Sequence, residues 1–290
     1  LGDVYKRQFK NGLHFGVTAS VADDKTEVTK WTYNTKIPSY GATGWWDKSA
    51  YKEGMVLGDI WGLQFDRFLT EDDFNADGSL KAGLPDQTKV FPAGYQFAPG
   101  DVLYKDLDNN GEIVKQTNTN DKGDLSVIGN ALPRLQFGLN LDAAWKGFDI
   151  SMFFQGVAKR KLWAAGNQVL PGFTTGEPFY KGAEDYWTPE NTDAFYPRPM
   201  DYKQSASGNY SVNDRYLLNM AYLRLKTFTV GYSLPKVWLS KFKVQGLRVY
   251  FTGENLFTID GVKPAIDPEI GIRTASGKSD QRNFGRSYPY

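Results

Sequence analysis

The sequence contains no cysteine and only one histidine, His14. The lack of cysteine excludes disulfide scaffolds, thiolate metal sites and cysteine nucleophiles. A single histidine leaves little support for a hydrolytic triad or a histidine-rich metal site, and His14 is expected to be a polar residue on one face of a strand. These absences favour a protein that is not an enzyme.

An excess of charge of one sign and long hydrophobic runs are also absent. The formal net charge is +1, with both signs interspersed, so no surface for nucleic acid is indicated. No run of about 18 or more uncharged apolar residues occurs, which excludes membrane-spanning helices. A membrane β-barrel is not excluded, because its strands need only roughly 9 to 11 residues and face lipid at alternate positions.

Aromatic residues, in contrast, are plentiful. They make up 15% of the chain and include 17 tyrosines. This content suits the aromatic girdles of a membrane barrel, and it equally suits a secreted or surface carbohydrate-binding β-sandwich. Composition alone leaves both classes open.

Alternation of apolar and polar residues with a period of two is the main positive signal. It predicts a strand over residues 13–22, a turn at Asp23–Asp24 and a second strand at about 26–33. The clearest hairpin spans residues 135–154 around a two-residue turn, Lys146–Gly147. Its strands exceed the usual length of roughly 5 to 6 residues and fit tilted crossings of a bilayer.

The second half of the chain continues this pattern. Residues 216–232 predict a strand with a β-bulge near Thr227, where the alternation slips out of phase. Residues 247–257 alternate again. The stretch 157–212 between the hairpin and these strands is irregular but rich in aromatic residues, which predicts an ordered extracellular loop.

An acidic segment has the spacing of the first part of an EF-hand-type calcium loop, with Gly111 at the sharp turn. Thr117 stands where the last acidic ligand is usual, so Asp121 or Asp124 would have to supply a carboxylate. A turn that satisfies its own backbone is the alternative. The candidate calcium ligands are the side chains of Asp106, Asp108 and Asn110 and the backbone carbonyl of Glu112.

Two further acidic stretches are interpreted as structural. Asp72, Asp73 and Asp77 are expected in a solvated loop. Glu184, Asp185 and Glu190 surround Trp187 and resemble the acid pair and aromatic platform of a glycosidase, but neighbours in one loop seldom stand on opposite sides of a sugar. Packing of this loop by its aromatic residues, or contact with a sugar or peptide, is favoured over catalysis.

Six segments carry specific motifs in a fixed order. They are PGDVLYKDLDNNG (99–111), VIGNALP (127–133), KGFDISMFFQG (146–156), DYWTPEN (185–191), YLRLKTFTVGYSLP (222–235) and LRVYFTGENLF (247–257). All six resemble motifs of the SusC/RagA-like TonB-dependent outer-membrane transporters, in the order in which that family uses them.

The resemblance implies an all-β fold: part of an antiparallel transmembrane β-barrel of about 22 strands with long extracellular loops. Residues 1–8 are expected to be a non-native or unassigned segment, and residues 9–290 a partial barrel from which the signal peptide, plug domain and last strand are absent. We expect seven or eight long strands. The turn at Lys146–Gly147 should lie at the end of the sheet opposite to the loops with Asp106 and Trp187. The outer face should display Leu139, Leu141, Ile150, Met152, Val249 and Phe251.

The same resemblance implies a function. The protein would import a nutrient such as a glycan or peptide oligomer across the outer membrane of a Bacteroidetes-type bacterium. Its partners would be membrane lipid, a SusD-like surface lipoprotein and, through the absent amino-terminal region, the TonB system. No cofactor is required beyond the possible calcium. The alternatives are the carbohydrate-binding β-sandwich and a siderophore-type TonB-dependent receptor.

Overall fold

The computed structural model describes residues 2–9, 12–30, 53–115, 122–164, 169–173, 183–200, 208–262 and 266–269. In these residues the chain is mostly β-structure and turns, with very little helix. It divides into two compact units. Unit 1 comprises Leu1–Lys25, Pro133–Arg160 and Met220–Gly261, and unit 2 comprises Thr26–Leu132, Lys161–Asn219 and Val262–Tyr290.

Among the described residues, no helix is both long enough and apolar enough to cross a membrane.

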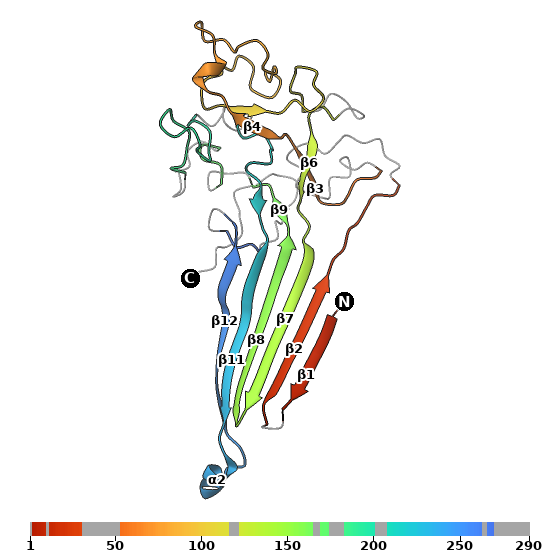
Figure 1. Cartoon of the computed structure of the whole chain (residues 1–290), viewed down its shortest axis with the longest axis vertical. Helices are drawn as coiled ribbons and strands as arrows, with labels where there is room; N and C mark the ends of the chain where they lie inside the picture. The colour runs from red at the N-terminus through yellow and green to blue at the C-terminus, as the bar shows by residue number, and fades with distance from the viewer. Residues whose placement is uncertain are drawn as a thin grey trace. The chain divides into compact units, whose positions relative to one another are not determined.

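Unit 1 is built on a six-stranded sheet in which every neighbouring pair of strands is antiparallel. Figure 1 shows the strands side by side, with the red amino-terminal strands at one edge and the blue strand at the other. In sheet order they are β1 (Gly2–Gln8), β2 (His14–Ala22), β7 (Arg134–Trp145), β8 (Phe148–Lys159), β11 (Tyr222–Ser233) and β12 (Arg248–Asp260).

One strand prediction at the start of the chain is wrong, and one strand there was not predicted. The described part of the predicted strand at 26–33 forms only an isolated bridge between Glu27 and Val56, and residues 31–33 lie outside the described residues. Residues 2–8, to which we assigned no strand, form β1. Every residue of β1 pairs with a residue of β2. Edge strands tolerate charged residues on both faces, so the missing alternation did not prevent pairing. Six strands are therefore described where seven or eight were expected.

The predicted β-bulge is confirmed. The pairing of β11 with β8 shifts between Leu225 and Thr227, and the pairing of β11 with β12 shifts at the same place. The extra residue, Lys226, returns Phe228 to the face that Leu225 occupies. Without it, the apolar residues on either side of the bulge would lie on opposite faces of the sheet.

The two ends of this sheet differ in their connections. At one end, β7 and β8 are joined by Lys146 and Gly147, which both have positive φ, as a two-residue hairpin turn requires. At the same end, β11 and β12 are joined by a segment that contains α2 (Lys236–Leu239) and η3 (Ser240–Phe242). The segments that contain Asp106 and Trp187 attach at the other end, after Ala22 and Lys159. The predicted asymmetry is confirmed for these points of attachment.

Unit 2 contains short strands in three pairs: β3 (Asp59–Gly62) with β6 (Ser126–Asn130), β4 (Phe65–Phe68) with β5 (Val102–Tyr104), and β9 (Lys161–Leu162) with β10 (Leu218–Asn219). A 3-10 turn, η2, spans Glu71–Asp73. The irregular stretch therefore begins after β9 and not at Val157, because β8 continues to Lys159. Of this stretch, residues 165–168, 174–182 and 201–207 lie outside the described residues.

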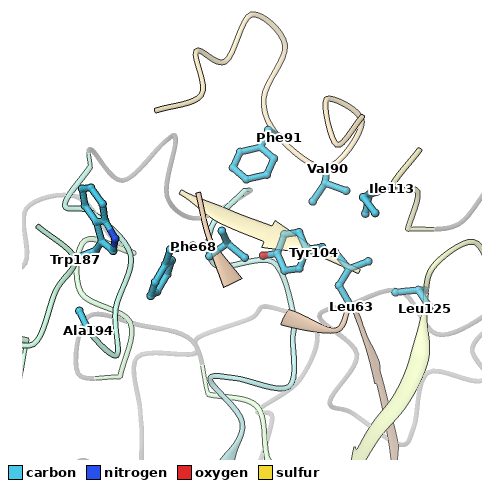
Figure 2. Close-up of a cluster of buried hydrophobic side chains, with 10 residues drawn as sticks. Leu63, Phe68, Val90, Phe91, Tyr104, Ile113, Leu125, Trp187 and Ala194 are labelled. Atoms are coloured by element: carbon cyan, nitrogen blue, oxygen red, sulfur yellow. The ribbon is translucent and has the colours of Figure 1, made fainter. Parts of the chain in front are cut away.

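A cluster of buried apolar side chains forms the core of unit 2. Figure 2 shows that these side chains come from segments far apart in the sequence, with Trp187 and Ala194 approaching Phe68. Tyr104 is fully buried there, and its hydroxyl donates a hydrogen bond of 2.8 Å to the carbonyl of Gly208. The prediction that the aromatic residues of this region pack in an ordered loop is confirmed for Trp187, which lies in the core.

Candidate functional site

The sheet of unit 1 has one face that is almost wholly apolar, which we call the apolar face. Side chains of directly paired residues lie on the same face of a sheet. Leu141 pairs with Met152, and further cross-strand pairs continue this face from β8 through β11 to β12. The prediction that six named residues share one face is therefore confirmed: Leu139, Leu141, Ile150, Met152, Val249 and Phe251.

The apolar face is open in this chain. Val249 and Phe251 are 61% and 63% exposed, and the described part of unit 1 contains only one sheet. In a β-sandwich, these residues would meet a second sheet in a dry interior. The observed arrangement favours the barrel interpretation over the sandwich, because a barrel strand shows its apolar residues to lipid.

The opposite face, which we call the polar face, carries hydrogen-bonded and charged side chains. Nδ1 of His14 lies 3.6 Å from a carboxylate oxygen of Asp142 on the neighbouring strand, which confirms the structural role expected for the histidine. The hydroxyls of Thr229 and Thr252 are 3.0 Å apart. Such side chains suit a surface that meets water or other polar groups.

Glycine makes room for one of these polar contacts. A Cβ atom added to Gly16 would lie 2.5 Å from the carboxylate of Asp142. The carboxylate therefore occupies the space directly above the glycine backbone, where His14 reaches it from the same strand. A larger residue at position 16 would displace Asp142 from His14.

The acidic loop brings together part of the predicted calcium ligand set. The carboxylates of Asp106, Asp108 and Asp124 offer oxygens that all lie within 4.8 Å of one another. Asp121, the other candidate for the missing carboxylate, lies outside the described residues. Side-chain Oδ1 of Asn110 accepts a hydrogen bond of 2.8 Å from the amide of Glu112. The side chain of Glu112 turns to Lys89 in an exposed ion pair, so only its backbone carbonyl could serve as a ligand.

The hydrogen bonds of the acidic loop also fit the alternative of a self-satisfied turn. The carboxylate of Asp106 accepts bonds from the amides of Asn110 and Gly111, at 3.3 and 2.7 Å. Desolvation alone would raise the pKa of Asp106, but the hydrogen bonds from the backbone amides together outweigh it and lower the pKa. Desolvation and the nearby charge of Asp124 raise the pKa of Asp108. A bound cation would offset the repulsion between the carboxylates of Asp108 and Asp124.

Asp124 is a buried structural residue as well as a candidate ligand. Its two carboxylate oxygens accept hydrogen bonds from the amides of Leu107 and Val114, at 2.8 and 2.7 Å. Its side chain is fully buried. It therefore joins the two ends of the acidic loop whether or not a cation is present.

The structure separates the residues that resembled a glycosidase site into exposed acids and a buried tryptophan. Glu184, Asp185 and Glu190 are all exposed. The side chain of Asp185 accepts a hydrogen bond of 3.4 Å from Asn191 within the same loop. Trp187 is buried against Gly100, and a Cβ atom at Gly100 would lie 2.5 Å from the indole ring. The indole therefore packs within the protein and does not offer a platform for a sugar ring.

The prediction of a solvated loop at 72–77 is wrong for Asp73. This residue is buried, and its carboxylate accepts two hydrogen bonds from Arg67, at 2.6 and 2.7 Å. It also accepts a bond of 2.7 Å from the amide of Thr70, where η2 begins. The pKa of Asp73 is lowered to about 2, mainly by the hydrogen bonds from Arg67.

No pattern in the sequence marks the buried polar network around Asp101, the first aspartate of the first motif. The carboxylate of Asp101 is fully buried and forms an ion pair of 2.8 Å with Arg198. It also accepts hydrogen bonds from the hydroxyl of Tyr95, the amide of Ala98 and the side-chain amide of Asn209, at 2.8 to 2.9 Å. Burial, followed by the charge of Asp101, raises the pKa of Tyr95.

A second missed residue is Arg215. Its guanidinium donates hydrogen bonds of 2.9 and 2.6 Å to the carbonyls of Phe195 and Ala194. It also lies 4.3 and 4.9 Å from the ring centroids of Phe65 and Phe68. Arg215 thereby connects the loop around Phe195 to β4 of unit 2. No local pattern of residues marks such a contact in advance.

Comparison with known proteins gives consistent results. No family model matches the chain. TonB-dependent receptor P3 of Formosa agariphila is 29% identical over 243 residues, which cover 82% of this chain and 21% of that protein. TonB-dependent receptor P26 of the same organism is 34% identical over 188 residues, covering 63% and 18%. TonB-dependent receptor SusC of Bacteroides thetaiotaomicron is 25% identical over 210 residues, covering 69% and 20%. The chain spans about a fifth of the length of these relatives.

Solved structures show the same fold. The RagAB peptide transporter superimposes with a TM-score of 0.61 and 17% identity, over 93% of this chain and 26% of that chain. The RagAB peptide importer in its open-open state gives a TM-score of 0.56 with 16% identity and the same coverage. The six motifs, the two-faced sheet and these relatives agree: in sequence and fold the chain is similar to the SusC/RagA-like TonB-dependent receptors.

Proposed function

We propose that this chain forms part of the wall and the extracellular loops of an outer-membrane β-barrel that imports a glycan or peptide oligomer. The two-faced sheet is the observation that carries the proposal. Its central strands have 12 residues each, and one face is apolar from β2 to β12. That length matches a tilted crossing of the bilayer, which needs roughly 9 to 11 residues.

The orientation of the wall follows from its connections. Transmembrane barrels have short turns on the periplasmic side and long loops outside the cell. The Lys146–Gly147 end of the sheet would then face the periplasm, and unit 2 would belong to the extracellular loops. The apolar face would contact lipid, and the polar face would line the lumen. The same family pattern supports a closed barrel of about 22 strands.

The proposed partners and energy source rest on the similarity to this family. We propose that a SusD-like surface lipoprotein acts with the barrel and that the TonB system drives import, through parts of the receptor outside this chain. The name TonB-dependent receptor supports the coupling, and the description of RagAB as a peptide transporter supports an oligomeric substrate. Transport by relatives also supports a role that is not enzymatic.

A pair of adjacent substitutions tests the membrane orientation in the full-length receptor. Met152 lies on the apolar face and Ser151 on the polar face of the same strand. We expect Met152→Arg to reduce the folded receptor in the outer membrane, because arginine near the bilayer midplane costs about 2–4 kcal/mol. Ser151→Arg should leave its amount nearly unchanged. Equal losses in both variants, measured by heat-modifiability and surface labelling, would contradict the proposed orientation.

Import requires its own measurement. Cells that lack the receptor gene should lose uptake of one class of oligomer, either glycans or peptides, and regain it with the wild-type gene. Removal of TonB should abolish the same uptake. Uptake of both classes at wild-type rates without the receptor would overturn the proposed import function while leaving the membrane orientation intact.

As a second role, we propose that the acidic loop binds calcium weakly. The convergence of Asp106, Asp108 and Asp124 supports this, together with the raised pKa of Asp108, which comes from desolvation first and from the charge of Asp124 second. Asn110 and the carbonyl of Glu112 complete the proposed ligand set. Bound calcium would order an extracellular loop and would have no catalytic role.

A further inference from the structure

We propose that the connection between β11 and β12 lies in the phospholipid head-group layer on the periplasmic side of the membrane. This connection, residues 234–247, is called the α2 loop below. The inference rests on the proposed function, because it requires the apolar face of unit 1 to contact lipid. It goes further by assigning a specific segment to the membrane surface.

The first observation is that the apolar face ends in aromatic residues at this end of the sheet. Trp145, Phe148 and Tyr232 are paired across β7, β8 and β11 in the last register positions before the turns. The rings of Phe148 and Tyr232 have centroids 4.4 Å apart, and Nζ of Lys146 lies 4.5 Å from the ring centroid of Trp145. Aromatic rings with adjacent lysines mark the level of the head groups in membrane proteins.

The α2 loop continues directly beyond this aromatic end. Figure 1 shows α2 past the ends of β11 and β12, within the same unit of the chain. The loop starts after Ser233, one residue beyond Tyr232. In the proposed orientation, this end of the sheet faces the periplasm. The α2 loop is therefore the part of unit 1 that follows the aromatic residues on the periplasmic side of the hydrocarbon layer.

The second observation is the exposed surface of the α2 loop itself. Val237 and Trp238 are 75% and 59% exposed, while Leu239 beside them is buried. An exposed tryptophan with a neighbouring valine is costly in water but suits the head-group layer, where an amphipathic ring meets both apolar and polar groups.

The third observation is charge. Between residues 234 and 247 the sequence has no aspartate or glutamate and has three lysines. All three lysines, Lys236, Lys241 and Lys243, are exposed. Basic residues next to apolar ones match the phosphates and acyl-chain boundary of a phospholipid leaflet, and anionic lipids strengthen the attraction. A protein partner would need a complementary acidic surface, whereas every phospholipid supplies a phosphate.

Depth measurement in the full-length receptor, reconstituted in phospholipid bilayers, tests the inference. Single spin labels would be placed at Val237, at Phe251 on the apolar face and at Asp77 in an exposed turn of unit 2, on a background without other reactive cysteines. Collisions with oxygen and with a water-soluble nickel chelate then report depth. We expect the Phe251 label in the hydrocarbon layer, the Asp77 label in water and the Val237 label at the level of the phosphates.

These three labels separate the two proposals. A Val237 label as accessible to the nickel chelate as the Asp77 label, with the Phe251 label still in hydrocarbon, would overturn the inference and leave the membrane orientation standing. A Phe251 label that is also in water would overturn the proposed function itself. The labels should not prevent folding of the receptor, because the side chains at all three positions are exposed in this chain.

The charge argument has a matched test. Phosphatidylglycerol should shift the Val237 label deeper than phosphatidylcholine does, and about 1 M salt should remove the shift, because the Debye length falls to about 3 Å. The triple change of Lys236, Lys241 and Lys243 to glutamine should also remove it. The control changes Lys81, Lys105 and Lys122, exposed lysines of unit 2, to glutamine and should retain it. A shift that is equal in both triple variants contradicts head-group recognition by the loop.

Discussion

Nε of Arg198 lies 2.8 Å from Oδ1 of Asp101, a carboxylate with no exposed surface. The two residues are 97 positions apart in the sequence, so the pair joins the first family motif to the segment that follows the Trp187 loop. A Cβ atom added to Gly100, which precedes Asp101, would lie 2.5 Å from the ring of Trp187 and 2.9 Å from Cβ of Arg198. The ion pair and the packing of the indole ring therefore belong to one arrangement within unit 2.

Loss of Arg198 is expected to destabilise this arrangement strongly. Arg198→Met leaves the buried carboxylate of Asp101 without its charged partner, and breaking a buried pair costs about 3–5 kcal/mol. The matched control is Lys89→Met, which removes an exposed ion pair with Glu112 and should leave the stability nearly unchanged, because exposed ion pairs contribute little. Hydrogen exchange of residues 95–104 in the full-length receptor measures both changes. Equal protection in the two variants would show that the buried pair contributes little.

The Arg67–Asp73 pair is expected to make the stability of unit 2 depend on pH. Arg67 lowers the pKa of Asp73 to about 2 from an ordinary value of 3.8. A depressed folded-state pKa adds stability that is fully present above the unfolded pKa and is lost as pH falls toward 2. Because the side chain of Arg67 is 42% exposed, we expect only about 1 kcal/mol after solvent screening.

The measurement compares hydrogen exchange of the η2 segment in wild type and Arg67→Met at pH 5 and near pH 2. The wild type should be better protected than the variant at pH 5, and the difference should shrink near pH 2. A difference that stays constant over this range would mean that Arg67 acts through packing and not through the charge of Asp73.

The hairpin turn of β7 and β8 should require glycine at its second position. Gly147 has a φ of 90°, and a Cβ atom there would lie 2.8 Å from the carbonyl oxygen of Ser233. Gly147→Val should therefore destabilise the turn by about 1–3 kcal/mol. Lys146→Asn should be neutral or stabilising, because asparagine tolerates the left-handed conformation that Lys146 adopts at φ 49°. Refolding yield of the receptor into detergent micelles reports both effects, and similar yields would argue against this role of the glycine.

The features that the sequence predicts correctly are those that depend on patterns of neighbouring residues. Strands β7, β8, β11 and β12 were predicted because alternation is a property of neighbouring residues. The bulge near Thr227 followed from a slip in that alternation. Strand β1 was missed because its charged residues hide the alternation, and edge pairing depends on backbone groups that every sequence has.

Contacts between distant segments explain the failures at the site. No spacing rule connects Asp101 with Arg198 or Arg215 with Phe65, since these contacts arise only after the loops have packed. The acidic loop lies between the two cases. Its spacing indicated Asp106, Asp108 and Asn110, but the structure was needed to bring the carboxylate of Asp124 into the group.

Calcium binding by the acidic loop is the last prediction. The receptor in detergent should bind calcium with a Kd of about 0.1–1 mM, the range of weak extracellular sites. Asp108→Ala should abolish the heat of binding and the calcium-dependent rise in Tm. Because calcium competes with protons for carboxylates, and the pKa of Asp108 is raised, affinity should weaken as the pH is lowered.

The matched control is Asp77→Ala. Asp77 is also an exposed turn aspartate, and its carboxylate accepts hydrogen bonds from the amide and hydroxyl of Ser79, at 3.0 and 2.6 Å. It lies outside the cluster that Asp106, Asp108 and Asp124 form, so its loss should leave calcium binding intact. Identical calorimetric heats in wild type, Asp108→Ala and Asp77→Ala would show that the loop is a turn satisfied by its own hydrogen bonds. Loss of binding in both variants would indicate non-specific attraction of calcium to surface carboxylates, because only one of the two substitutions removes a proposed ligand.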